Sequence, residues 1–143
     1  MIQQLNKKRV NQKIDILDFL SDNFNYDFYV TKDNIRYYIN DNLNLFLNES
    51  EPVLFYENCG DVEGVLGVWR GFGKDKKRHY VKICAKNVHV AKGLLTVLLW
   101  NSEFKNLFVK IRKDSEFVGI FREKNFRFKG GRGVQLLLHR KNK

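Results

Sequence analysis

The segment from Arg78 to Trp100 constrains the fold more than any other part of the chain. It opens with His79–Cys84, a run typical of a β-strand, and passes through Ala85–Asn87 into the apolar segment Val88–Trp100. The length and leucine content of that segment predict a helix. A strand that leads directly into a helix places unpaired helical N–H groups at the strand's carboxyl end, where they attract phosphate. An ordinary strand and helix of an α/β core would have the same pattern.

The N-terminal third predicts two helices. Ile2–Leu5 is compatible with a short first strand, and an apolar stripe over Gln12–Asn23 predicts a helix. Thr31 resembles the N-cap of a second helix, whose apolar positions recur at steps of three and four. Tyr26–Val30 joins the two helices and is strongly aromatic, so it either lines a cleft or covers a small core.

The remainder predicts strands with two helices among them. Val53–Glu57 and Val62–Arg70 are typical of strands, and Gly64 and Gly67 within the second indicate a bulge or a close backbone approach. The later expected elements are the strand Leu107–Ile111, the helix Phe117–Lys124, and the strands Phe126–Lys129 and Val134–Arg140 around a turn at Gly130–Gly133. This order predicts an α+β fold with a mixed sheet in which one strand pair is parallel.

Length and cysteine usage limit the class of protein. A chain of 143 residues fits one domain, residues 1–143, that buries a core without disulfides. No apolar run reaches the roughly 18 residues of a membrane span. Cys59 and Cys84 belong to no cluster with metal-ligand spacing, and a buried free thiol is expected for Cys84. We therefore expect a cytoplasmic protein with no metal site and no membrane partner.

The net charge of +10 predicts an anionic partner, such as nucleic acid, an acidic protein or a polyphosphate cofactor. The richness in Lys and Asn is equally typical of an AT-rich bacterial or phage genome. Charge therefore indicates a class of partner and no reaction.

The order of elements resembles that of the GCN5-related N-acetyltransferases (GNAT) along nearly the whole chain. The run Phe121–Phe128 is similar to the family's Y-E-K-x-G-F helix end, and Gly133–Leu138 follows it as the last apolar strand. Lys86–Ala91 is similar to the acetyl-coenzyme A signature R/Q-x-x-G-x-G/A, with His89 at the first small position and Ala91 at the second.

This resemblance implies a mostly antiparallel central sheet flanked by helices, with a splayed parallel strand pair, and acetyl-CoA as co-substrate. Successive backbone N–H groups at the helix start would bind the pyrophosphate. The backbone of Val81 and Ile83 would pair with the pantetheine arm. The implied cofactor-binding residues are Val81, Ile83, Lys86, Asn87, Val88, His89, Val90, Ala91 and Lys92.

The resemblance also implies acetyl transfer to an amine, with a base for the ammonium and an acid for the departing thiolate. The family's acid is a Tyr, and the matching Phe121 has no proton to donate. Asp114 stands where family members often have an Asn that contacts the cofactor. The candidates that remain are Tyr80 as acid and Glu57 as base, with Glu63 and Asp75 as further carboxylates.

Basic residues cluster at Lys74–Arg78 and again between Arg122 and Lys143. If they share a face, they form a surface for a phosphate backbone, with Phe126, Phe128 or Trp69 as stacking surfaces. Two functions therefore remain open: an acetyl-CoA-dependent N-acyltransferase with an unknown acceptor, and a GNAT-like binding module without catalysis that contacts nucleic acid or a host protein.

Overall fold

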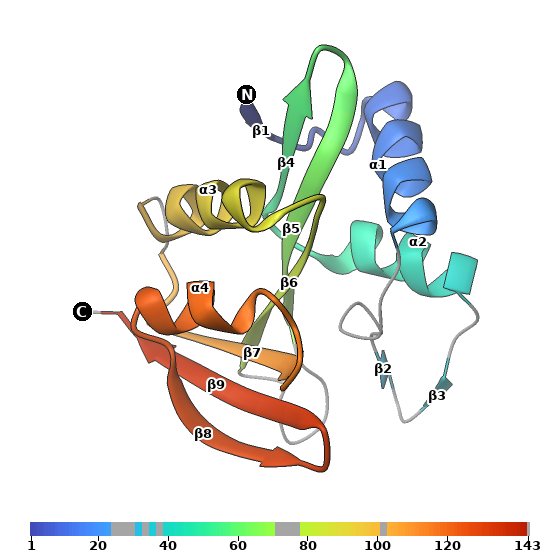
Figure 1. Ribbon diagram of the computed structural model, residues 1–143. Coiled ribbons are helices and arrows are strands. Elements are labelled where there is room, and N and C mark those ends of the chain that lie inside the picture. The colour runs from blue at the N-terminus through green and yellow to red at the C-terminus, as the bar shows by residue number, and fades with distance from the viewer. Residues whose placement is uncertain (24–30, 33–34, 37–38, 71–77, 101–102, 143) are drawn as a thin grey trace.

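The computed structural model describes residues 1–23, 31–32, 35–36, 39–70, 78–100 and 103–142 (Figure 1). The elements follow in the order β1 (Ile2–Gln4), α1 (Val10–Asp22), β2 (Thr31–Lys32), β3 (Ile35–Arg36), α2 (Ile39–Glu49), β4 (Val53–Asn58), β5 (Asp61–Arg70), β6 (His79–Ala85), α3 (Val88–Trp100), β7 (Asn106–Arg112), α4 (Val118–Glu123), β8 (Arg127–Arg132) and β9 (Gln135–Lys141).

The centre of the molecule is a seven-stranded sheet in the order β1-β4-β5-β6-β7-β9-β8. Its strand pairs are antiparallel except β6 and β7, which run parallel because α3 connects them. This confirms the predicted α+β class and its single parallel pair. The strands β2 and β3 form a separate two-stranded sheet.

Helices cover both faces of the sheet (Figure 1). Alternation along β6 divides its side chains between the two faces. Val81 and Ile83 join a core with α3 and α4, whereas Tyr80 and Cys84 join a second core with α1 and α2. Within the described parts of the chain, no helix is long and apolar enough to span a membrane.

The two glycines of β5 serve the close approach that the sequence predicts. A Cβ on Gly67 would lie 2.4 Å from Cζ of Phe46, a fully buried side chain of α2. A Cβ on Gly64 would lie 2.6 Å from Cγ1 of Val90, in the first turn of α3. The register between β4 and β5 also shifts beside Gly64, which leaves Glu63 as an extra residue of β5. Bulge and close approach therefore both occur.

Two predictions of local structure were wrong. Thr31 caps no helix: it lies in β2, paired with Arg36, and α2 begins at Ile39. Thr31 and Ile35 are β-branched residues, which favour strands, and the pairing of β2 with β3 overrides a weak capping pattern. The last turn also lies later than predicted, because β8 continues through Arg132 and Gly133 takes the positive φ of 59°. Tyr26–Val30 lies outside the described residues.

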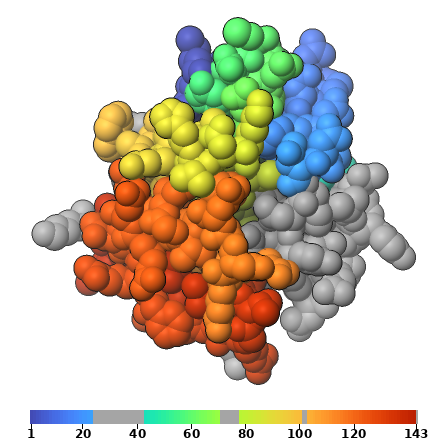
Figure 2. All heavy atoms as spheres, in the orientation of Figure 1, coloured from blue at the N-terminus to red at the C-terminus, as the bar shows by residue number. Residues whose placement is uncertain are grey.

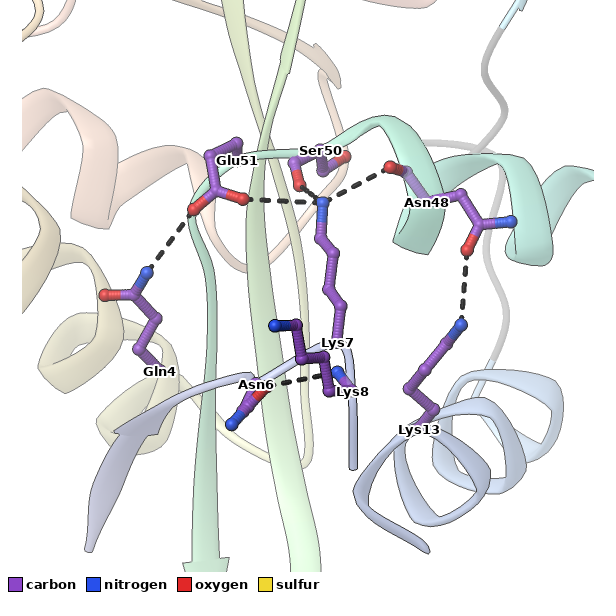
Figure 3. Close-up of polar contacts among 8 residues, drawn as sticks. All are labelled: Gln4, Asn6, Lys7, Lys8, Lys13, Asn48, Ser50 and Glu51. Atoms are coloured by element: carbon purple, nitrogen blue, oxygen red, sulfur yellow. Dashed lines mark hydrogen bonds and ion pairs between the residues drawn. The ribbon is translucent and has the colours of Figure 1, made fainter. Parts of the chain in front are cut away.

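Lys7 connects the N-terminal segment to the C-terminal end of α2 through hydrogen bonds (Figure 3). Its ammonium group donates to the backbone oxygens of Ser50 at 2.6 Å and Asn48 at 3.2 Å, and lies 3.4 Å from the carboxylate of Glu51. The last carbonyl groups of a helix lack intrahelical donors and carry partial negative charge. Lys7 therefore acts as a C-terminal cap supplied by a distant part of the chain.

Replacing Lys7 with methionine is expected to lower the free energy of unfolding by about 1–2 kcal/mol, because it removes a charged donor from two carbonyl oxygens. Urea denaturation followed by circular dichroism measures the change. Lys8→Met is the matched control, because Lys8 is exposed, and its cost should stay within about 0.5 kcal/mol. Equal losses in the two variants would contradict the capping role.

Candidate cofactor site and active site

The parallel pair β6–β7 is joined at one position. Tyr80 and Phe108 are register partners, and no further pair follows toward the carboxyl ends of the two strands. The other edge of β6 is paired with β5 from His79 to Ala85. The strands β6 and β7 therefore separate beyond Tyr80, as predicted. Backbone groups of β6 that face this gap can pair with an extended ligand.

Val81 and Ile83 lie on β6 along this gap. Their side chains are 1% and 4% exposed and belong to the core beneath α3. Side-chain packing and main-chain binding are compatible here, because the backbone edge of the strand is a different surface from its side chains. Both residues therefore lie on the strand that borders the gap, and their binding to the pantetheine arm stays a prediction.

The first turn of α3 begins at the carboxyl end of β6. Asn87 is its N-cap, and the side-chain Oδ1 accepts a hydrogen bond of 2.9 Å from the N–H of Val90. The N–H of Lys86 donates to the carbonyl oxygen of Glu63 at 2.8 Å. The N–H groups of Val88 and His89 find no acceptor among the described residues. These two groups, at the positive end of a 13-residue helix, are available to an anion.

The side chains of this turn point to two environments. Val90 and Ala91 are 5% and 0% exposed and face the core, whereas Val88 is 40% exposed and His89 is also exposed. The imidazole of His89 is therefore not packed into the core. Ala91 is fully buried, and Gly64 on β5 leaves the space into which the side chains of Val90 and Leu94 pack.

Two lysines flank the helix start, and each pairs with a glutamate. The ammonium group of Lys86 lies 3.6 Å from Glu63, and that of Lys92 lies 3.3 Å from Glu123 of α4. The Lys86 and Lys92 side chains are 66% and 50% exposed. Exposed ion pairs contribute little stability, so either lysine can exchange its carboxylate for a phosphate.

The catalytic candidates lie apart in the sheet. Tyr80 is 4% exposed, its ring lies 5.9 Å from that of Phe108, and the ammonium group of Lys110 lies 4.9 Å from its ring centroid. Glu57 lies on β4, and β5 separates that strand from β6. The structure therefore does not bring Tyr80 and Glu57 together. Asp75 lies outside the described residues.

The end of α4 adopts the geometry that the resemblance implies, with different residues. Asn125 takes the place of the family's Gly and has the positive φ of 66° that this position requires. The N–H of Phe126 donates to the carbonyl oxygen of Phe121 at 3.0 Å, and that of Asn125 to Arg122 at 3.1 Å. These two bonds form a Schellman motif, completed by the contact between the Phe121 and Phe126 rings at 5.1 Å.

Asp114 lies in the turn between β7 and α4, and the side chain is exposed. The hydrogen bond from Arg112, at 3.1 Å, lowers the pKa of this carboxyl below its usual value, as does the guanidinium charge. Arg112 therefore offsets the negative charge that Asp114 would present to a phosphate.

A groove of about 480 Å³ lies between α1, the β4–β5 turn and Lys86. Acidic side chains dominate its lining, and such a lining attracts cations. This groove was not predicted, although aspartates at positions 15, 18 and 22 recur at helical spacing. The carboxylates are those of Asp15, Asp18, Asp22, Asp61 and Glu63. In the described part of the chain, no group of three or more His, Cys, Asp or Glu residues is arranged to hold a metal ion.

No family model and no curated protein sequence matches the chain. Solved structures do match. A ribosomal-protein-alanine N-acetyltransferase from Brucella melitensis superposes with a TM-score of 0.72 at 14% identity, covering 99% of both chains. A GNAT-family acetyltransferase from Streptococcus pneumoniae gives a TM-score of 0.70 at 13% identity, covering 99% of this chain and 98% of that one.

A third similar structure is yncA from Salmonella typhimurium, which was solved with its cofactor acetyl-CoA. Its TM-score is 0.65 at 13% identity, and the match covers 99% of this chain and 92% of yncA. Identities this low establish the arrangement of the backbone and not the chemistry of individual side chains. The separated parallel strands, the helix that follows them and these superpositions together give the chain the fold of the GCN5-related N-acetyltransferases.

Proposed function

We propose that this protein is an acetyl-CoA-dependent N-acyltransferase that transfers an acetyl group to an amine of its acceptor. The observation that carries the proposal is the gap between β6 and β7 beyond Tyr80, which leads to the unpaired N–H groups of Val88 and His89. The extended pantetheine arm of acetyl-CoA fits the gap between the strands, and its pyrophosphate fits the unpaired N–H groups. The likeness to yncA, solved with acetyl-CoA, supports the same ligand.

The chain's own residues divide the binding task. The backbone of Val81 and Ile83 would hold the pantetheine arm, and the N–H groups of Val88 and His89 would hold the pyrophosphate. Lys86 and Lys92 lie close enough to that helix start to add positive charge once they leave Glu63 and Glu123.

Acetyl-CoA supplies a thioester, whose carbonyl carbon forms a C–N bond with the acceptor nitrogen as the C–S bond breaks. The acceptor nitrogen loses one proton and the departing sulfur gains one. Phe121 cannot give that proton, and its side chain is fully buried. Tyr80 remains the proposed acid and Glu57 the proposed base. Since a bulk-water proton can also reach a thiolate, the reaction does not require a Tyr at position 121.

Thermal unfolding with and without acetyl-CoA tests the proposal. A ligand at about 100 times its dissociation constant adds about 2.7 kcal/mol to the free energy of unfolding. For a chain of 143 residues this raises Tm by roughly 5–10 °C. Absence of any shift at millimolar acetyl-CoA would overturn the proposal and favour a binding module without catalysis.

Transfer itself is tested by release of the CoA thiol in the presence of a panel of amines. Cys59 is exposed and would react with a thiol reagent, so the assay uses a Cys59→Asn background. Asparagine tolerates the positive φ of 52° at this position. Cys84 needs no replacement, because burial raises the pKa of its thiol to about 12.

A further inference from the structure

The positive charge of the protein is concentrated at its C-terminal end. Residues 105–143 contain twelve Lys or Arg and three Asp or Glu, whereas residues 1–104 contain fourteen and thirteen. The described part of the first group forms β7, α4, β9 and β8, which occupy one end of the molecule (orange to red in Figure 2). The net charge of +10 therefore belongs almost wholly to one end of the sheet.

Strand alternation places many of these cations on one sheet face. Phe108 of β7 lies in the core on the α1–α2 side. Its register partner His139 stacks on it, with 4.5 Å between the two ring centroids. Residues at two-residue steps from these, and their register partners on β8, share that face. We call this surface the basic face; its cations are Lys110, Arg112, Lys141, Arg127 and Arg132.

Positive charges also act on His139, which lies on this face. Burial lowers the pKa of His139, and the positive charges of Lys129, Arg78 and Lys141 lower it further. Asp114 offsets Arg112. Among the described residues, no carboxylate lies within ion-pair distance of Arg127, Lys129, Arg132 or Lys141.

Phe128 adds an apolar ring to this charged edge. It is 67% exposed on β8, the outermost strand of the sheet, and its register partner Leu138 lies in the core beneath α3 and α4, so the ring is on the sheet face opposite to Arg127. Phe126 and Trp69, the other two stacking candidates, are 2% and 4% exposed, and the prediction that they offer stacking surfaces was therefore wrong. A lone aromatic ring among cations on a strand edge is the arrangement that binds a base and its flanking phosphates.

We propose that β8 and the basic face bind single-stranded nucleic acid that crosses the free edge of β8, with phosphates at Arg127, Lys129 and Arg132 and a base stacked on Phe128 on the opposite face. The strand provides these cations along about 15 Å of accessible edge. An anionic membrane fits less well, because Phe128 and the exposed Val134 are separated by charged residues and form no continuous apolar patch. The proposal does not depend on acyl transfer.

Fluorescence anisotropy of the full chain with a fluorescein-labelled dT20 tests the proposal. We expect dT20 to bind, and the logarithm of the binding constant to fall with the logarithm of the salt concentration with a slope of about −0.7 for each phosphate contact. The Arg127→Glu/Arg132→Glu variant should weaken binding at least about tenfold and reduce the magnitude of that slope by about 1–2. The matched control is Lys8→Glu/Arg9→Glu, which makes the same change of net charge at the other end of the sheet.

Equal weakening by the two charge variants would overturn the basic face as the binding surface. Phe128→Ser distinguishes nucleic acid from other polyanions: it should weaken dT20 binding by about 5–100-fold through lost stacking, and leave binding of inorganic polyphosphate unchanged. Equal effects on both ligands would overturn the nucleic-acid proposal. The nucleic-acid proposal would also be overturned if the protein bound phosphatidylserine vesicles more tightly than dT20 and the Arg127→Glu/Arg132→Glu variant lost that vesicle binding. Thermal melting confirms that each variant is folded.

Discussion

Replacing Val88 with glutamate is expected to weaken acetyl-CoA binding by at least about a hundredfold while leaving the protein as stable as before or more so. The carboxylate would stand beside the N–H groups proposed to bind pyrophosphate, and like charges in contact repel strongly. The same carboxylate interacts favourably with the helix dipole and should stabilise the folded protein by about 0.3–1 kcal/mol. The first turn of α3 has no acidic residue at present. Thermal melting with and without acetyl-CoA measures both effects.

The control for this variant is Val88→Gln, which has a side chain of the same size without charge and should retain most of the ligand-induced shift. Val88 suits the test because it is 40% exposed. Ala91 does not, since it is fully buried and a glutamate there would destabilise the core. A full acetyl-CoA shift in Val88→Glu would place the phosphate site elsewhere.

Replacing Phe121 with alanine is expected to lower the free energy of unfolding by about 3–5 kcal/mol. Phe121 is fully buried in the core beneath α3 and α4, and its ring meets that of Phe126 edge-on. Alanine would leave a cavity and remove the hydrophobic contact of the Schellman motif. Urea denaturation measures the loss.

Phe128→Ala is the matched control, because it removes the same atoms from a ring that is 67% exposed. Its effect on stability should stay within about 0.5 kcal/mol. A loss below about 1 kcal/mol for Phe121→Ala would mean that the ring does not hold α4 on the sheet.

Local chemistry explains why some predictions were confirmed. The helix over Val88–Trp100 was predicted with the bounds it has, because its apolar run begins after an Asn that caps it. The positive φ of Asn125 has an equally local reason, because Asn is among the residues that most readily replace Gly in this conformation. In both cases a few neighbouring residues decide the conformation.

Other features depend on partners that are distant in sequence. Neither the ion pair between Glu63 and Lys86 nor that between Lys92 and Glu123 of α4 was predicted. The acidic groove likewise combines residues of α1 with those of the β4–β5 turn. Side-chain periodicity indicates which face a residue occupies on its own element, but not which other element covers that face.

The sequence by itself determined the order of the helices and of the central sheet's strands, and the junction of β6 with α3, because capping, periodicity and turn chemistry act between near neighbours. Only the tertiary structure decided that Tyr80 and Glu57 lie apart and that the cations of the basic face lie together. These features follow from strand order and register, which are set by burial of the whole sheet between two helical layers.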